Sequence, residues 1–163
     1  MYAELCAYLS HCPELYFAIS SKKNLFHRTL LIMCEEVFRK VPPDEVETEE
    51  RMSLRRSALS NMRFLAELYK NQLITNRIAF EIMHTLLDDS KEEDKIEAAC
   101  EFILNCPEKI RATPQIKLEG ILTQLDSIKE CVSSRIKFKI LDIFDAKKSG
   151  WRRNRFESGP SKI

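Results

Sequence analysis

The chain is poor in the residues from which nucleotide and metal sites are built. Its 163 residues include three glycines and three histidines. Gly120, Gly150 and Gly159 lie too far apart to form a glycine-rich phosphate loop. The histidines, at positions 11, 27 and 84, lack ligand spacing, and no nucleophile or carboxylate pair accompanies them in a catalytic pattern. We therefore expect a protein without a cofactor or metal that is not an enzyme.

Paired cysteines and long apolar runs are also missing. None of the six cysteines forms a Cys-x-x-Cys pair, and no secretory signal precedes them, so we interpret them as reduced, half-buried apolar residues. Charge interrupts every helix-sized window, which leaves no run near the roughly 18 apolar residues of a membrane span. The sequence predicts a soluble, cytoplasmic protein that does not enter a membrane.

Helical signals fill almost the whole chain instead. Few β-branched runs or tight-turn dipeptides compete with them, which favours an all-α protein. The predicted helices lie near residues 2–10, 14–20, 24–40, 49–70, 76–88, 91–105, 114–131 and 134–147. Four of them present apolar stripes that we expect to face a core: Leu59, Met62, Ala66 and Tyr69; Ile96, Ala99, Cys100, Ile103 and Leu104; Leu118, Ile121, Leu122, Leu125 and Ile128; and Ile136, Ile140, Leu141, Ile143 and Phe144.

Potential helix caps recur with a period near forty. Thr48, Ser90 and Ser133 each precede a helix, Thr75 and Thr113 begin the helices between them, and Ser90 with Glu93 fits a capping box. Helix pairs that recur every 40 to 47 residues are typical of HEAT-like solenoids. A compact irregular bundle is the alternative. We favour a HEAT-like α-α superhelix, a solenoid of antiparallel helix pairs, over residues 1–147, followed by a basic tail over 148–163 that contains Trp151.

Two blocks carry a family resemblance. RRSALSNMRFLAELYKNQLIT (Arg55–Thr75) and SSRIKFKILDIFDAKKSGWRRNR (Ser133–Arg155) closely resemble the middle HEAT domain of eukaryotic translation initiation factor 4 gamma, and the opening helix and exit segment are similar to it as well. The resemblance implies a scaffold that binds and stimulates the DEAD-box RNA helicase of the cap-binding complex, and that also contacts RNA and the ribosome-recruiting factor. That domain begins before the helix that Met1 opens, so the resemblance implies an N-terminally shortened form.

The same chain lacks the motif that binds the cap-binding protein. That motif places a leucine five positions after a tyrosine, whereas Ala7, Pro13, Ser21 and Ile74 follow the four tyrosines at that distance. We therefore expect no cap-binding-protein site here.

The last helix and the tail hold the residues that we expect to contact the helicase. These are Phe138, Asp142, Asp145, Lys148, Trp151 and Arg153. For Phe138 the alternative is packing against the preceding repeat. For Trp151 the alternative is an indole that folds back to seal the end of the solenoid. A docking role predicts that Trp151→Ala with Arg153→Glu weakens helicase binding and leaves the thermal melt nearly unchanged.

A second group of residues is expected to contact RNA weakly: Arg55, Arg56, Arg63, Arg152 and Arg155. Arg55 and Arg56 have an alternative role as ion-pair partners of the acids at 44–50. The sequence thus favours a translation initiation scaffold with auxiliary binding of mRNA. The competing hypothesis is an RNA-binding or regulatory scaffold of the same fold that acts in mRNA splicing, decay or translational control.

Overall fold

The described part of the chain is a set of helices. The computed structural model describes residues 2–10, 32, 33, 36, 48–88 and 92–151, and these residues contain no strand. The helices are α1 (Tyr2–Ser10), α4 (Glu49–Lys70), α5 (Asn76–Asp88), α6 (Glu93–Asn105), α7 (Pro107–Arg111), α8 (Gln115–Ile128) and α9 (Ser134–Lys148). The predicted helix at 14–20 and most of the one at 24–40 lie outside the described residues. The all-α prediction is confirmed.

Helix ends agree with the predicted caps only in part. Thr48 is the N-cap of α4 and accepts a hydrogen bond from the backbone N–H of Arg51. Thr75 accepts one at the start of α5, and Ser133 is the N-cap residue of α9. The prediction for Thr113 was wrong, because its hydroxyl donates to the carbonyl oxygen of Ile110 at 2.6 Å and so follows α7, a short helix that was missed. Ser90 lies outside the described residues.

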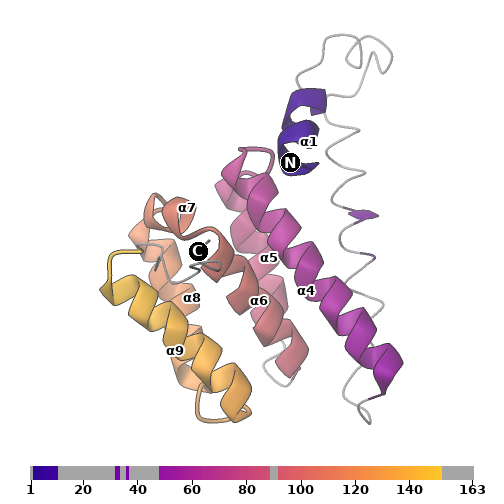
Figure 1. Cartoon of the computed structure of the whole chain (residues 1–163). Helices are drawn as coiled ribbons and strands as arrows, with labels where there is room; N and C mark the ends of the chain where they lie inside the picture. The colour runs from indigo at the N-terminus through magenta and orange to yellow at the C-terminus, as the bar shows by residue number, and fades with distance from the viewer. Residues whose placement is uncertain (1, 11–31, 34–35, 37–47, 89–91, 152–163) are drawn as a thin grey trace, which may run out of the picture.

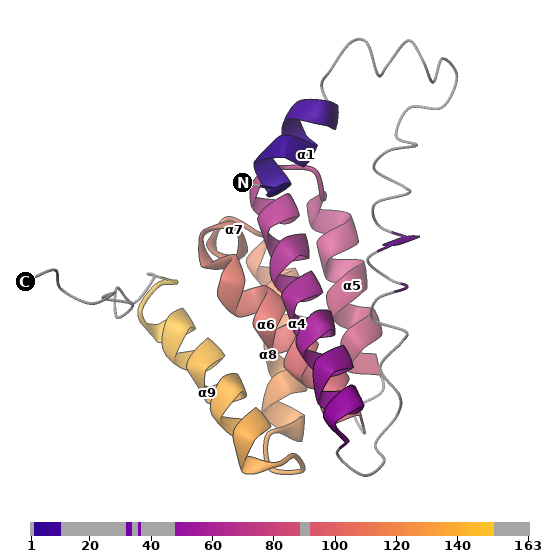
Figure 2. The ribbon, with the colours of Figure 1, turned by 45° about the vertical axis from the view of Figure 1, so that its right-hand side comes forward.

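The longer helices form two layers. Helix α6 lies between α4 and α9 in one layer, and α5 and α8 pack behind them in the other (Figures 1 and 2). Helix α1 contacts α4 near the C-terminal end of α4. Each layer adds one helix per repeat, with α4 and α5 as one pair and α6 and α8 as the next. This arrangement is the HEAT-like solenoid that the spacing predicts.

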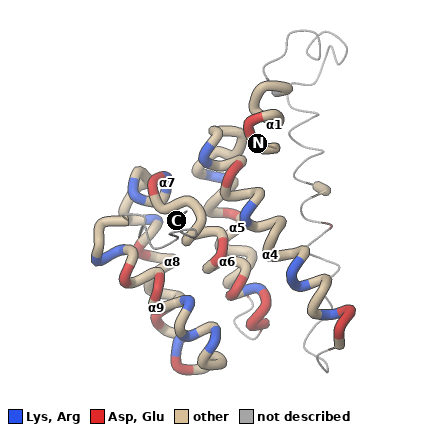
Figure 3. Tube along the Cα trace, viewed as in Figure 1, with Lys and Arg blue, Asp and Glu red and all other residues tan. Residues whose placement is uncertain are grey.

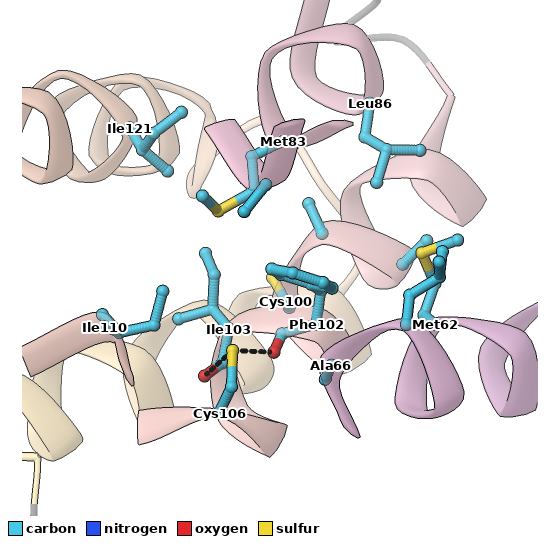
Figure 4. Close-up of a cluster of buried hydrophobic side chains, with 14 of the residues drawn as sticks. Met62, Ala66, Met83, Leu86, Cys100, Phe102, Ile103, Cys106, Ile110 and Ile121 are labelled. Atoms are coloured by element: carbon cyan, nitrogen blue, oxygen red, sulfur yellow. Dashed lines mark hydrogen bonds between the residues drawn. The ribbon is translucent and has the colours of Figure 1, made fainter. Parts of the chain in front are cut away.

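The core lies where the layers meet. Figure 4 shows part of it, with Met83 and Ile121 on one side and Phe102, Ile103 and Cys106 on the other. The apolar stripes predicted for α4, α6, α8 and α9 contribute to this core. Leu59, Leu104, Ile128 and Phe144 are only half-buried, and Leu141 is an exception, because 37% of it is exposed.

Helix α6 occupies the centre of the packing. Every residue from Ile96 to Ile103 is buried, although Glu97 and Glu101 belong to that run. A helix with neighbours on three sides needs apolar residues on those sides, and any charge on its fourth side requires partners. The two glutamates therefore mark the side of α6 where the candidate functional site lies.

Candidate functional site

The fourth side of α6 carries a ladder of ion pairs that joins three helices. We call it the α6 ladder; its carboxylates are Asp94, Glu97 and Glu101 on α6, and its cations are Arg51, Arg55 and Arg63 on α4 and Arg135 and Lys139 on α9. The partners joined by hydrogen bonds lie 38 to 43 positions apart in the sequence. Since the pairs advance in the same direction, α4, α6 and α9 run parallel and in register. Figure 3 shows basic positions on α4 and α9 on either side of acidic α6.

Glu97 is the centre of this ladder. Its side chain is 4% exposed, and Oε2 accepts from Arg55 of α4 and from Arg135 of α9, each at 2.5 Å. Lys139 lies 2.9 Å from its other oxygen. Desolvation of a carboxylate is costly unless charged partners surround it, and here three cations from two helices do so. Removal of Glu97 would leave Arg55 with Asp94 and Lys139 with Glu101, while Arg135 would lose the carboxylate that it binds.

Glu101 continues the ladder toward the end of α6. It pairs with Arg63 at 2.5 Å and with Lys139 at 3.0 Å. Burial opposes ionisation of Glu101, but the hydrogen bonds and charges of Arg63 and Lys139 outweigh burial and lower its pKa below the ordinary 4.5. For Lys139, burial likewise opposes the charge, and the two carboxylates outweigh it and raise its pKa. Both groups are therefore charged at neutral pH.

The predicted RNA-binding residues on α4 differ in how far they reach solvent. Arg55 is mostly buried and pairs with Asp94 and Glu97, so its guanidinium is engaged within the ladder, while the acids expected as partners lie largely outside the described residues. Arg56 is exposed and donates to the carbonyl oxygen of Met52 at 3.3 Å. Arg63 combines a bond to Glu101 with a side chain that is 58% exposed. Arg152 and Arg155 lie outside the described residues.

The predicted helicase-binding residues of α9 share one exposed face. Phe138 is 66% exposed, and Leu141, Asp142 and Asp145 are exposed with it. Residues at these spacings lie on one side of a helix, so we call them together the α9 face. The alternative for Phe138, burial against the preceding repeat, does not agree with this exposure. Lys148 is exposed at the end of the same helix, 3.5 Å from Asp145.

Trp151 lies in the core, unlike the members of its predicted group on α9. It is 6% exposed and belongs to the buried cluster. Gly150 and Trp151 both have left-handed φ angles, 69° and 58°, and the N–H of Trp151 donates to the carbonyl oxygen of Ala146 at 2.7 Å. These two residues turn the chain back after α9, as the fold-back alternative requires. This burial argues against the expectation that Trp151→Ala with Arg153→Glu leaves the melt nearly unchanged. Arg153 lies outside the described residues.

The acids of the ladder were missed from the sequence. A detectable signal existed, because Asp94, Glu97 and Glu101 follow one another at helical spacing on a helix whose other sides are apolar. Their partners could not be read in the same way, since nothing local relates Arg55 to a residue some forty positions later. From the sequence, Arg55 was therefore expected to contact RNA or to pair with the acids at 44–50.

The described residues contain neither a membrane-spanning helix nor a cluster of metal ligands. Over residues 2–10, 48–88 and 92–151, no helix combines the length and apolar character needed to cross a membrane. The same ranges hold no group of three or more His, Cys, Asp or Glu side chains arranged to hold a metal ion.

A parallel, in-register stack of helix pairs with an exposed terminal face defines a helical-repeat protein of the HEAT-like class. The MIF4G domain family model matches residues 1–150. The chain therefore belongs to the MIF4G domain family.

Several translation initiation factors are similar to the chain. Eukaryotic translation initiation factor 4G of Oryza sativa is 32% identical over 187 positions that include the whole chain. Eukaryotic translation initiation factor 4 gamma of Schizosaccharomyces pombe is 29% identical over 85% of the chain. The chain spans only 10% and 11% of the lengths of these two relatives.

Proposed function

We propose that this chain is the part of a cytoplasmic translation initiation scaffold that binds a DEAD-box RNA helicase, and that the α9 face is the contact. The single observation that carries the proposal is the exposure of Phe138 on the last described helix of a MIF4G domain. The chain itself breaks no bond in this proposal. It holds the helicase so that ATP turnover proceeds faster on the partner. The ribosome-recruiting factor is a further expected partner.

The chemistry of the α9 face supports a protein partner. A large aromatic side chain in water gains free energy when a partner covers it, and aromatic residues at the centre of an interface often dominate its affinity. Leu141 extends the apolar area beside Phe138, and Asp142 and Asp145 add negative charge. The fitting partner surface is an apolar pocket bordered by lysine or arginine, since such charges steer association and fix orientation.

Calorimetry with the purified helicase of the same organism tests the proposal. We expect Phe138→Ala to weaken binding by about tenfold or more, which is the size of a hot-spot loss. The matched control is Ile116→Ala on α8, which removes an apolar side chain that is 90% exposed and is not part of the α9 face. Both variants should melt like the parent protein. Absence of binding by the parent protein, or equal binding by Phe138→Ala, would contradict the proposal.

Auxiliary RNA binding is a second candidate function, supported by the charge of the ladder. Among the described residues, five cations surround its three carboxylates. Two arginines of α4 reach solvent: Arg63, which belongs to the ladder, and Arg56, which does not. A single-stranded RNA held this way should lose affinity with salt by a slope of about 0.7 per phosphate contacted. Arg56→Gln with Arg63→Gln should reduce that slope. A salt dependence unchanged by these substitutions would contradict RNA binding through Arg56 and Arg63.

The process in which the scaffold acts has a separate test. A scaffold of translation initiation and one of splicing, decay or translational control can share this fold, and they differ in the helicase paralogue that they retain. Co-purification followed by mass spectrometry distinguishes them. Recovery of the initiation helicase is expected, and recovery of a nuclear or decay paralogue alone would favour the alternative.

A further inference from the structure

The α6 ladder anchors the same helix that carries the α9 face. Arg135 and Lys139 bind Glu97 and Glu101 from one side of α9, at distances between 2.5 and 3.0 Å. Ile136, Ile140 and Ile143 are buried on a second side. Phe138 follows Arg135 by three positions and Asp142 follows Lys139 by three, so the α9 face begins directly beside the anchored side. The rotation of α9 about its axis decides where Phe138 points.

Apolar packing alone specifies that rotation less well than charged contacts do. Isoleucine side chains tolerate small rotations of a helix, whereas an arginine bound to a carboxylate has a directional geometry. Since Glu97 is buried and bonded to α4 as well, it offers α9 a fixed point in the preceding repeats. Lys147 gives a weaker, exposed contact to Glu119 near the other end of α9.

We infer that Glu97 is a positioning residue for partner binding: through Arg135 and Lys139 it holds α9 in the rotation that presents Phe138 and Asp142 to the partner. This inference rests on the proposed function, because the affinity that it controls is that of the α9 face. Glu97 itself touches no partner. Its loss leaves α9 attached by its isoleucines and by the contacts of Ser133 with Glu93, Lys139 with Glu101 and Lys147 with Glu119. Without the bond from Arg135 to Glu97, we expect α9 to take up a broader range of orientations.

Glu97→Gln tests this role, with Glu81→Gln as the matched control. Glutamine keeps the size of the side chain and removes its charge, and Glu81 loses only an exposed pair with Arg77 within α5. Helicase affinity is measured by calorimetry at a temperature where circular dichroism shows each variant folded. We expect Glu97→Gln to raise Kd by about tenfold, within the usual range of coupling between sites, and Glu81→Gln to leave it unchanged.

Double electron–electron resonance, which measures the distance between two spin labels, provides a second test. A residue that only stabilises the fold would not change this distance. Spin labels on keto amino acids at Ser60 of α4 and Ser134 of α9, both exposed, report how α9 is held. The distance distribution should broaden in Glu97→Gln and stay narrow in Glu81→Gln. A folded Glu97→Gln protein with the parent's distribution or the parent's Kd would overturn the inference.

Arg135→Gln keeps the test decisive if Glu97→Gln does not fold. It removes a partly exposed cation from α9 alone and should weaken binding in the same direction. Where both variants fold, the double variant should bind no more weakly than Glu97→Gln, because the two residues act through one contact. Effects that multiply would overturn the inference. Loss of binding in Phe138→Ala with parental binding in Glu97→Gln would leave the proposed function standing and remove the positioning role.

Discussion

Ser133 donates both its backbone N–H and its hydroxyl to Glu93, one to each carboxylate oxygen and each at 2.6 Å. Ser133 is the N-cap residue of α9, yet its hydroxyl makes no bond to the N–H groups of its own helix. Glu93 stands in the first turn of α6. A carboxylate from the neighbouring repeat therefore accepts from the N-cap N–H of α9, a role that the N3 glutamate of a capping box performs within a single helix.

Glu93→Ala should lower the free energy of unfolding by about 1 kcal/mol, the usual cost of a lost cap. Ser133→Ala should cost less, because its backbone N–H still reaches Glu93. Urea denaturation of the two variants measures the difference. An equal loss in both would mean that the hydroxyl carries the whole interaction.

Acid should weaken the ladder through Glu101. The pKa of Glu101 is lower in the folded protein than its ordinary 4.5, so its contribution is complete above about pH 4.5 and is lost as the pH falls through the folded value. The difference in unfolding free energy between the parent and Glu101→Gln should be about 1 to 3 kcal/mol at neutral pH and should shrink as the pH falls below the folded-state pKa of Glu101. Denaturation at several pH values measures it. A difference that stays constant with pH would contradict the assignment.

Trp151→Ala should destabilise the protein by about 3 to 5 kcal/mol, as expected for removal of a buried large aromatic side chain. Its left-handed backbone adds strain of about 1 to 2 kcal/mol that burial of the indole must exceed. The thermal melt gives the result, and the exposed Phe138→Ala serves as the comparison. A melt unchanged by Trp151→Ala would place the indole outside the core in solution.

Two glycines should respond to alanine in opposite directions. Gly150 has a φ of 69°, where a Cβ is strained, so Gly150→Ala should cost about 1 kcal/mol. Gly120 lies within α8 with open space where an alanine Cβ would lie, so Gly120→Ala should add up to about 1 kcal/mol of stability. Chemical denaturation measures both. The same sign for both variants would contradict this account.

Features of the fold that depend on residues close together in the sequence could be predicted. Periodicity and local caps are short-range, and they located α4, α5 and α9 within a residue or so of their observed ends. Helix α7 was missed because its five residues, Pro107–Arg111, are too few to show a period. Phe138, Asp142 and Asp145 of the α9 face were anticipated, since a helical wheel separates them from the isoleucines. Leu141 was expected in the core and is exposed.

Pairs between repeats could not be anticipated in this way. Ser133 with Glu93, and Arg135 with Glu97, become neighbours only after the helices stack, and each residue alone has an ordinary local role. The position of Trp151 could not be predicted for a different reason. Its surroundings of arginine and lysine suggested a surface residue, whereas two left-handed residues, which composition does not reveal, return it to the interior.

The parallel register of the ladder restricts where this domain can change length during evolution. One residue inserted within α6 would turn all later side chains by about 100°, and Glu101 would leave its cations while apolar residues moved out of the core. Extra residues inserted in the connections between helices leave every ion pair of the α6 ladder in place. The rice relative aligns over 187 positions with a chain of 163, and we expect its additional residues to fall in such connections.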